Sequence, residues 1–180
     1  MKRFFLMSCL AFALGSCNNE TKDTKETPMA KDTATAEVEL PYKLDKPYKN
    51  WQMGSTENAI AAMKALKSYV DKDFTALSAL VSDSLEVAFD HYQSKMGHDS
   101  AIKFFTDSRN MSGDIAITMY DYESVVSADK KEEWVTLWYK QVWSDNAGKK
   151  DSLSIIDDCK MKDGKIAILD EKIQHYQVKK

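Results

Sequence analysis

The sequence has few of the residues that build metal sites and disulfide frameworks. Its 180 residues include only three cysteines and three histidines. The histidines lie far apart, from His91 to His175, and the chain has neither a Cys-x-x-Cys pair nor a His-x-x-x-His pair at helical spacing. We therefore expect no metal site and no cofactor.

A basic stripe of the kind that binds nucleic acid is also missing. The chain has 25 Lys and Arg residues against 28 Asp and Glu residues. If residues 1–16 are removed, Lys2 and Arg3 leave with them, so that 25 − 2 = 23 basic residues face 28 acidic ones, a net charge of −5. A mixed, mildly acidic surface argues against nucleic acid as a partner.

The first residues carry a targeting pattern instead of a membrane-spanning one. Lys2 and Arg3 precede an apolar run that is typical of a secretory signal and too short to span a bilayer as a helix. The segment Leu14-Gly15-Ser16-Cys17 resembles the bacterial lipobox, in which the cysteine receives the lipid. We predict a signal peptide over residues 1–16 and palmitate-type lipidation at Cys17. The resemblance implies a lipoprotein anchored to a membrane of the bacterial cell envelope, on the periplasmic or outer surface, and leaves the membrane and leaflet open.

The remaining cysteine is expected to be a packing residue. Cys9 leaves with the signal and Cys17 is acylated, so Cys159 stands alone in a compartment where disulfides can form. Cys159 lies in the strand-like segment 155–159, and buried single cysteines behave as small apolar residues. We expect no disulfide within the domain.

The mature chain divides into a tether and one domain. Residues 17–50 are rich in Thr, Lys, Asp and Glu, contain all three prolines and have no apolar period until their end, so we predict a disordered tether after the lipidated cysteine. Its last part, around Tyr48 and Trp51, can fold back onto the domain as a strap. Residues 51–180 are long enough for one domain with its own core.

The first half of this domain has the pattern of three helices and a strand. Apolar residues recur at three- and four-residue steps after Ser55 and Thr56, either of which can cap the first helix. A second helix is expected after the cap Asp73, a strand over residues 84–91, and, after a loop containing Gly97, a third helix over residues 100–109 with Asp99 as its cap.

The second half alternates with period two, which predicts four long strands. They are expected over residues 115–126, 133–144, 151–161 and 165–177, joined by turns that include Asp163-Gly164. The second strand holds three of the four tryptophans in an alternating, β-branched and aromatic run. Four consecutive strands with such turns predict an antiparallel meander.

This order of elements resembles the nuclear transport factor 2-like superfamily, in its SnoaL-like branch. The residues that carry the resemblance are the segment 70–77 with Leu80 and Val81, Gly97 before the third helix, and the segment 163–166. The resemblance covers about residues 55–177. It implies an α+β fold in which a curved antiparallel sheet wraps as a cone around about three N-terminal helices and leaves a pocket. Because this fold hosts both enzymes and binding modules, the fold alone does not decide the function.

The isomerases of this superfamily imply a catalytic set that the chain matches only in part. They use a general-base Asp at the end of the first strand, near Asp90, whose neighbour His91 titrates near neutral pH; these two are the catalytic candidates. The partner tyrosine of the first helix corresponds to a position near Ala65, and the partner acid to a position near Leu153 or Ser154, so both partners are missing. A shifted site that uses Tyr69 with Asp157 or Asp158 would be a new arrangement.

A hairpin register with even offsets sorts the strand residues into two faces. One face would carry Tyr120, Tyr122, Trp134, Trp138, Ile156, Asp158, Leu169, Glu171, Ile173 and His175. The other would carry Ile117, Met119, Leu137, Tyr139, Trp143, Ile155, Asp157, Cys159 and Ile168. The pocket candidates are Tyr120, Tyr122, Trp134, Trp138, Asp158 and His175. A one-residue slip would exchange the faces downstream of it, so the sequence leaves open which face lines the pocket.

Three functions stay open at this point. The preferred one is a non-catalytic envelope module that binds a small apolar or aromatic ligand or a partner protein. The second is a SnoaL-like isomerase, cyclase or hydrolase with an Asp general base in the cone pocket. The third is an interaction module that forms a homodimer through its outer sheet face.

Overall fold

The computed structural model describes residues 40–145 and 148–175. The chain divides into two units, residues 1–43 and 44–180. Of the first unit only residues 40–43 are described, and they form neither a helix nor a strand. All that follows concerns the second unit.

The described residues of the second unit form three helices and one mixed sheet of seven strands. The elements are β1 Gln52–Met53, α1 Thr56–Asp71, α2 Phe74–Leu80, β2 Val81–Phe89, β3 Tyr92–Gly97, α3 His98–Asn110, β4 Ile115–Val126, β5 Glu133–Ser144, β6 Lys150–Lys162 and β7 Lys165–His175. None of the described helices has the length and apolar character needed to cross a membrane.

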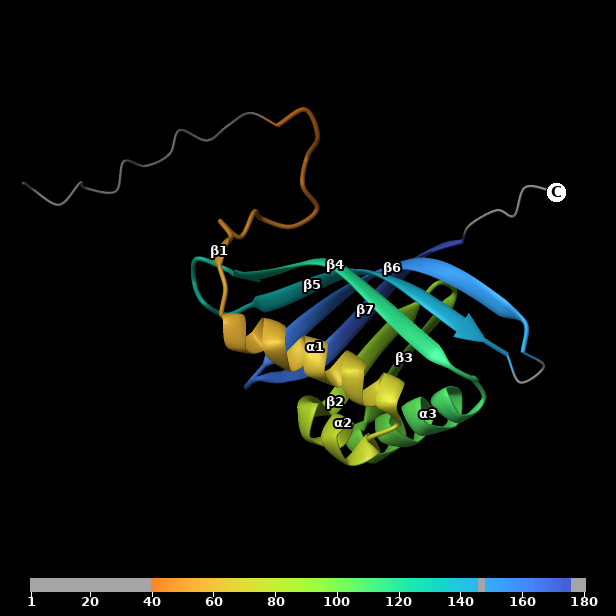
Figure 1. Cartoon of the computed structure of the whole chain (residues 1–180). Coiled ribbons are helices and arrows are strands. Elements are labelled where there is room, and N and C mark those ends of the chain that lie inside the picture. Colours follow the sequence, from red (N-terminus) through yellow and green to blue (C-terminus); the bar gives the residue numbers. More distant parts are fainter. Residues whose placement is uncertain (1–39, 146–147, 176–180) are drawn as a thin grey trace, which may run out of the picture. The chain divides into compact units, whose positions relative to one another are not determined.

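The four long strands form the predicted meander. The strand order is β1-β4-β5-β6-β7-β2-β3, and every pair is antiparallel except β2 with β7. Figure 1 shows α1, α2 and α3 together on one side of the curved sheet. The predicted α+β cone with about three helices is confirmed.

Two of the expected helix caps are also confirmed. The Ser55 hydroxyl accepts a hydrogen bond from the backbone N–H of Asn58 at 3.1 Å, and the Asp73 carboxylate accepts one from Ala76 at 3.0 Å. Between them α1 ends at Asp71, and its C-cap Lys72 has a left-handed φ of 61°, so the chain reverses there without a glycine.

The region after the first predicted strand differs from the prediction. The segment expected to be a loop is β3, which pairs with β2 in a hairpin. The third helix begins at His98, earlier than expected, and its N-cap Gly97 makes no side-chain capping bond, so Asp99 lies inside the first turn. Short polar strands such as Tyr92–Gly97 carry little alternation of apolar residues, which is why the pattern did not reveal β3.

The core lies between the helices and the concave side of the sheet. Small residues of α1 allow close approach, and Ala59, Ala62 and Ala65 are all buried. They pack opposite large buried residues of the meander such as Leu137 and Tyr139.

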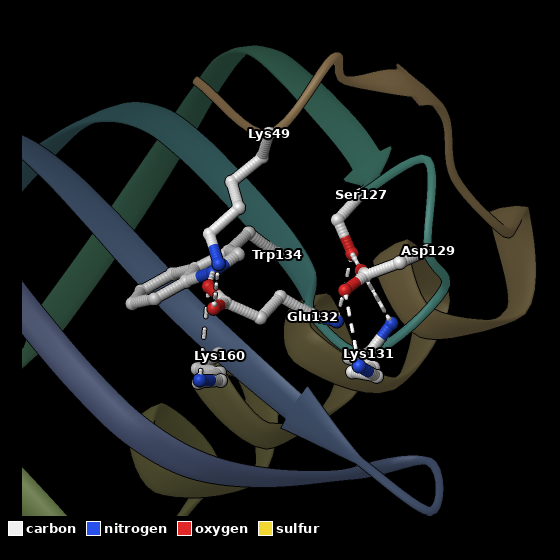
Figure 2. Close-up of polar contacts among 7 residues, drawn as sticks. All are labelled: Lys49, Ser127, Asp129, Lys131, Glu132, Trp134 and Lys160. Atoms are coloured by element: carbon white, nitrogen blue, oxygen red, sulfur yellow. Dashed lines mark hydrogen bonds and ion pairs between the residues drawn. The ribbon is translucent and has the colours of Figure 1, made fainter. Parts of the chain in front are cut away.

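A polar cluster holds the chain that precedes α1 against the β4–β5 turn (Figure 2). The Ser127 hydroxyl accepts hydrogen bonds from the N–H groups of Lys131 and Glu132 and donates one to Asp129. Glu132 pairs with Lys49 at 3.0 Å and with Lys160 at 3.8 Å. The Lys49 carbonyl also accepts a hydrogen bond from Ala128, so this segment is tied down by backbone and side chain together.

Candidate functional site

A cavity of about 310 Å³ lies between the three helices and the concave side of the sheet. Most of its wall is apolar or aromatic, as is typical of small-molecule sites. The residues that line it are Ala62, Ala65, Leu66, Tyr69, Leu77, Val81, Leu85, Phe89, Phe104, Phe105, Ser108, Leu137, Tyr139, Gln141, Asp157, Cys159, Ile166, Leu169 and Glu171.

Two carboxyl groups, from Asp157 and Glu171, are the ionisable acids of this wall. Asp157 lies on β6 directly opposite Leu137 of β5 and Glu171 of β7. Directly opposed residues of antiparallel strands share one face and stand side by side. The sheet therefore presents the two acids to the cavity as an adjacent pair.

A β-bulge sets the orientation of Glu171. The β6–β7 ladder shifts between the pairs Met161–Ile166 and Lys160–Ile168, which leaves Ala167 without a partner on β6. The extra residue exchanges the faces of the rest of β7. As a result Glu171 pairs with Asp157 rather than with Ile156.

Asp157 is buried and only half satisfied. Its Oδ2 accepts a hydrogen bond of 2.9 Å from the Tyr139 hydroxyl. Its Oδ1 is buried and has no hydrogen-bond partner among the described residues. A buried polar atom without a partner is costly and often marks a place where a ligand or water binds.

Burial keeps protons on this pair near neutral pH. Loss of solvation, followed by the nearby charge of Glu171, raises the pKa of Asp157 to about 8, against the opposing effect of the Tyr139 hydrogen bond. Loss of solvation raises the pKa of Glu171 to about 7. Such a pair can donate a proton in one state and accept one in the other at the same pH.

The neighbouring titratable groups stay protonated. Burial and then the charge of Asp157 raise the pKa of Tyr139 well above its ordinary value, and the same two causes raise the pKa of the Cys159 thiol. Tyr139 is therefore a hydrogen-bond donor to the pair. Cys159, a free buried cysteine, is a neutral thiol rather than a thiolate nucleophile.

Aromatic side chains border the cavity on its helical side. Tyr69 of α1 packs edge to face on Phe105 of α3 at 6.0 Å, and Phe105 packs in the same way on Phe104 at 5.5 Å. Phe104 stacks on Phe89 of β2 at 6.0 Å. The Tyr69 and Ser108 hydroxyls lie 3.4 Å apart and add a polar point to this wall.

The structure places the two catalytic candidates on an exposed turn. β2 ends at Phe89, and Asp90 adopts a left-handed backbone with φ of 43° that closes the hairpin to β3. The His91 ring lies 2.9 Å from the Asp90 carboxylate, and both side chains are mostly exposed. Neither residue lines the cavity.

The aromatic pocket candidates lie away from the cavity as well. Tyr120 occupies a bulge between β4 and β5 and is 57% exposed. This bulge places Tyr122, which is 45% exposed, opposite Leu137, whereas Trp138 is opposite Asp121. The Lys160 ammonium faces the Trp134 ring, 5.7 Å from the ring centre, and the Trp134 indole N–H donates to Glu132 (Figure 2).

The remaining candidates lie outside the cavity or outside the described residues. Asp158 accepts a hydrogen bond from Thr136 and pairs with Lys172 at 2.6 Å, so its charge is balanced outside the cavity. The backbone of His175 pairs with Leu153 at the end of β7, and its side chain lies outside the described residues. Cys17, the lipidation candidate, also lies outside the described part of the chain.

Of the two cavity acids, the sequence indicated only Asp157, as part of an alternative catalytic site. Tyr69 and Asp157, named there as a new arrangement, both line the cavity. Glu171 was assigned to the face of Asp158, because even-offset pairing takes no account of a bulge. No group of three or more His, Cys, Asp and Glu residues is placed to hold a metal ion in the described part.

No family model and no curated protein matches the chain. Solved structures with the same architecture do match. An LEH-like epoxide hydrolase of M. tuberculosis is 15% identical with a TM-score of 0.55, over 67% of this chain and 84% of that one. A nuclear transport factor 2-like protein of unknown function from Burkholderia pseudomallei is 9% identical with a TM-score of 0.55, over 67% of this chain and 92% of that one.

The chain has the nuclear transport factor 2-like fold. AusH from Aspergillus nidulans shares it at 11% identity and a TM-score of 0.54, over 68% of this chain and 87% of that one. At these identities the likeness shows the fold alone, and function has to be argued from the residues of this chain.

Proposed function

We propose that the cone cavity binds a small, mostly apolar organic molecule and holds its polar group against the Asp157–Glu171 pair. The observation that carries this proposal is the Asp157 Oδ1 atom, which is buried in the cavity wall without a partner among the described residues. A ligand group that donates to or accepts from this carboxyl would satisfy it. The apolar and aromatic remainder of the wall would hold the rest of the molecule.

Blocking the cavity tests this proposal. Ala65 is 3% exposed and lines the cavity, so Ala65→Phe would fill the space that the ligand needs. Ala79 of α2 is exposed and outside the cavity wall, which makes Ala79→Phe the matched control. Calorimetric titration of the full chain with naphthylmethanol should show binding that Ala65→Phe abolishes and Ala79→Phe preserves. Equal binding by both variants would place the ligand elsewhere.

Acid–base catalysis is a second candidate, and the same acids support it. Two carboxyls with raised pKa values in a mostly apolar cavity are suited to move a proton on a bound substrate at neutral pH. This arrangement differs from a site at Asp90, because the base would come from the middle of the sheet. A putative ketosteroid isomerase from Kribbella flavida shares the fold at 10% identity and a TM-score of 0.50, over 69% of this chain and 82% of that one.

A proton-shift assay separates catalysis from binding alone. The substrate would be a cyclic β,γ-unsaturated ketone, whose conversion to the conjugated isomer is followed by ultraviolet absorbance. An enzyme should lose about 10² to 10⁴-fold in rate on Asp157→Asn or Glu171→Gln, while Asp90→Asn should leave the rate unchanged. Binding of the ketone without conversion would leave the domain as a binding module.

The anchor completes the proposed function. With Cys17 acylated, the domain would stay at a membrane of the cell envelope and take its ligand there. The lipobox-like segment Leu14–Cys17 supports this.

A further inference from the structure

The chemical character of the ligand follows from the charges that face the cavity. Among its lining residues only Asp157 and Glu171 carry acidic groups, and none is Lys, Arg or His. The wall therefore offers two carboxyl groups, which become negative when they release a proton, without any positive counterpart. An anionic ligand would meet repulsion and no cation to pair with.

The acids are not neutralised from outside the cavity. Lys172, a cation whose charge acts on Asp157, makes its ion pairs with Asp158 at 2.6 Å and with Asp170 at 3.1 Å. Arg109 is buried, but its guanidinium donates to backbone carbonyls of Val70, Ser112 and Gly113. No ion pair of Asp157 or Glu171 occurs in the described part of the chain.

The same cavity has an aromatic wall suited to a cation. Four aromatic side chains, Tyr69, Phe89, Phe104 and Phe105, line it together with the acids. The faces of aromatic rings attract organic ammonium groups, and they do so more strongly when water is excluded. An ammonium also has several N–H donors, which match the unpartnered Oδ1 of Asp157.

We propose that the ligand is a small organic amine bound in its protonated form, with the ammonium between the Asp157–Glu171 pair and the aromatic wall. This inference depends on the proposed function, because it names the class of molecule that the same cavity binds. The cavity of about 310 Å³ has room for an amine attached to a ring system of one or two rings.

Binding of a cation would release a proton. The carboxyl pair holds a proton near neutral pH because the two acids are buried together, and an ammonium would replace that proton as the compensating positive charge. The displaced proton passes to the buffer. The reaction is then protonated protein plus ammonium ligand giving the complex plus one free proton. Affinity should therefore rise with pH, by up to about tenfold per unit, below the titration of the pair.

The groups around the pair would not produce this slope themselves. Tyr139 and Cys159 face it from β5 and β6, and the pKa of each is raised, so both stay neutral. On β7 the acid Asp170 and the cation Lys172 flank Glu171 in the chain, and the pKa of Lys172 is also raised, so it stays charged. Asp158 of β6 is an ion-pair partner of Lys172. From α1, the only titratable residue that lines the cavity is Tyr69.

Three probes with one ring system and different charges test the inference. Unlipidated full chain would be titrated with naphthylmethylamine, naphthylmethanol and naphthoic acid by calorimetry from pH 5.5 to 8.5. The amine should bind at least about tenfold more tightly than the alcohol at pH 8, and its affinity should rise with pH. The acid should not bind measurably. Buffers of different ionisation enthalpy should report the released proton.

Two variants assign the effect to the pair. Asp157→Asn and Glu171→Gln keep the side-chain volume and should each weaken the amine by about 10 to 100-fold, while the alcohol changes less than about threefold. Asp158→Asn, the adjacent acid outside the cavity, should leave the amine unchanged. Circular dichroism would confirm that each variant is folded.

The outcomes separate the two proposals. If the alcohol binds as tightly as the amine, or amine affinity falls with pH, the ligand class is wrong and the binding function stands. Tighter binding of the acid would contradict the ligand class in the same way. If none of the three probes binds, and Ala65→Phe changes nothing, the proposed binding function itself fails.

Discussion

Asp157 gives the protein a stability that depends on pH. Its pKa is about 8 in the folded chain against 3.8 as the ordinary value, so the folded state holds a proton that the unfolded state has lost. Between these two values the free energy of unfolding falls as the pH rises, because folding must take up a proton. Asn has nearly the same shape, accepts the same hydrogen bond from Tyr139 and does not ionise. We expect Asp157→Asn to match the native chain near pH 4 and to be more stable by on the order of 2 kcal/mol at pH 8.

Chemical denaturation at several pH values measures this difference. Asp158→Asn is the control, because Asp158 pairs with Lys172 and the variant should lose rather than gain stability at pH 8. A gain from Asp157→Asn that is the same at pH 4 and pH 8 would show that the Asp157 carboxyl is not protonated by burial.

Replacing a glycine by serine should change the stability in opposite directions at two positions, Gly54 and Gly97. A Cβ at Gly54 would lie 2.8 Å from the backbone N of Val125 and 2.9 Å from the carbonyl carbon of Ser124, so the β1 segment would have to move away from β4. A Cβ at Gly97 meets nothing within 4 Å, and Gly97 is the N-cap of α3, where a serine hydroxyl can cap the helix. Gly54→Ser should lower the free energy of unfolding by about 1–3 kcal/mol, and Gly97→Ser should raise it by a few tenths of a kcal/mol.

Thermal unfolding followed by circular dichroism gives both values. Equal effects of the two substitutions would contradict the close approach of Gly54 to β4.

For single residues, the sequence predicted local hydrogen bonds better than it predicted which side of the sheet a side chain faces. The helix caps depend on local hydrogen bonds, so Ser55 and Asp73 could be named from the sequence. The cavity acids depend on which face of a strand each side chain takes. The bulge at Ala167 decides this for Glu171, and a separate bulge at Tyr120 shifts the aromatic residues of β4. Neither residue has a type that indicates a bulge.

Among the elements, the junction of α1, α3 and β4 depends on one buried cation. The Arg109 guanidinium is 5% exposed and donates to the carbonyls of Val70, Ser112 and Gly113. These carbonyls lie at helix ends and in the turn that follows, where no further helical N–H is available. The sequence placed Arg109 near a helix C-terminus but had no means to show that it also reaches the end of α1.

Arg109→Met should remove these bonds and leave the carbonyls without a donor. We expect a loss of about 2–4 kcal/mol in the free energy of unfolding. Arg109→Lys should recover only part of this loss. An ammonium lacks the planar, forked set of donors with which the guanidinium reaches both Val70 and the carbonyls of Ser112 and Gly113. Urea denaturation of the three proteins measures the series. A lysine variant as stable as the native chain would mean that charge alone, and not the guanidinium geometry, holds the junction.

The long strands show why elements were easier to predict than their pairing. β4 and β5 have the same bounds as the prediction, because each has a sustained period of two between turn residues. The hairpin β2–β3 was missed and β1 is only Gln52–Met53, since short strands are defined by their partners rather than by their own residues.

For the whole molecule, the cone explains how an apolar cavity coexists with a stable core. The three helices and the curved sheet meet around small residues such as Ala62 and Ala65 at one wall and around Asp157 at the other. Larger side chains in place of these alanines would fill the cavity. The small side chains therefore leave space next to the acids. This association of free volume with unsatisfied polarity is the reason to treat the cavity as a binding site rather than as imperfect packing.

The anchor makes a separate prediction at the same scale. If the segment Leu14–Cys17 is a lipobox, Cys17→Ser should abolish labelling by a radioactive fatty acid and release the protein from membranes into the soluble fraction. Cys159 provides an internal control, because its buried thiol lies at 2% exposure inside the domain and is closed to acylation. Cys159→Ala should therefore keep full labelling. Labelling that persists in Cys17→Ser would refute the anchor, and the cavity would then have to be understood in a protein that is free of the membrane.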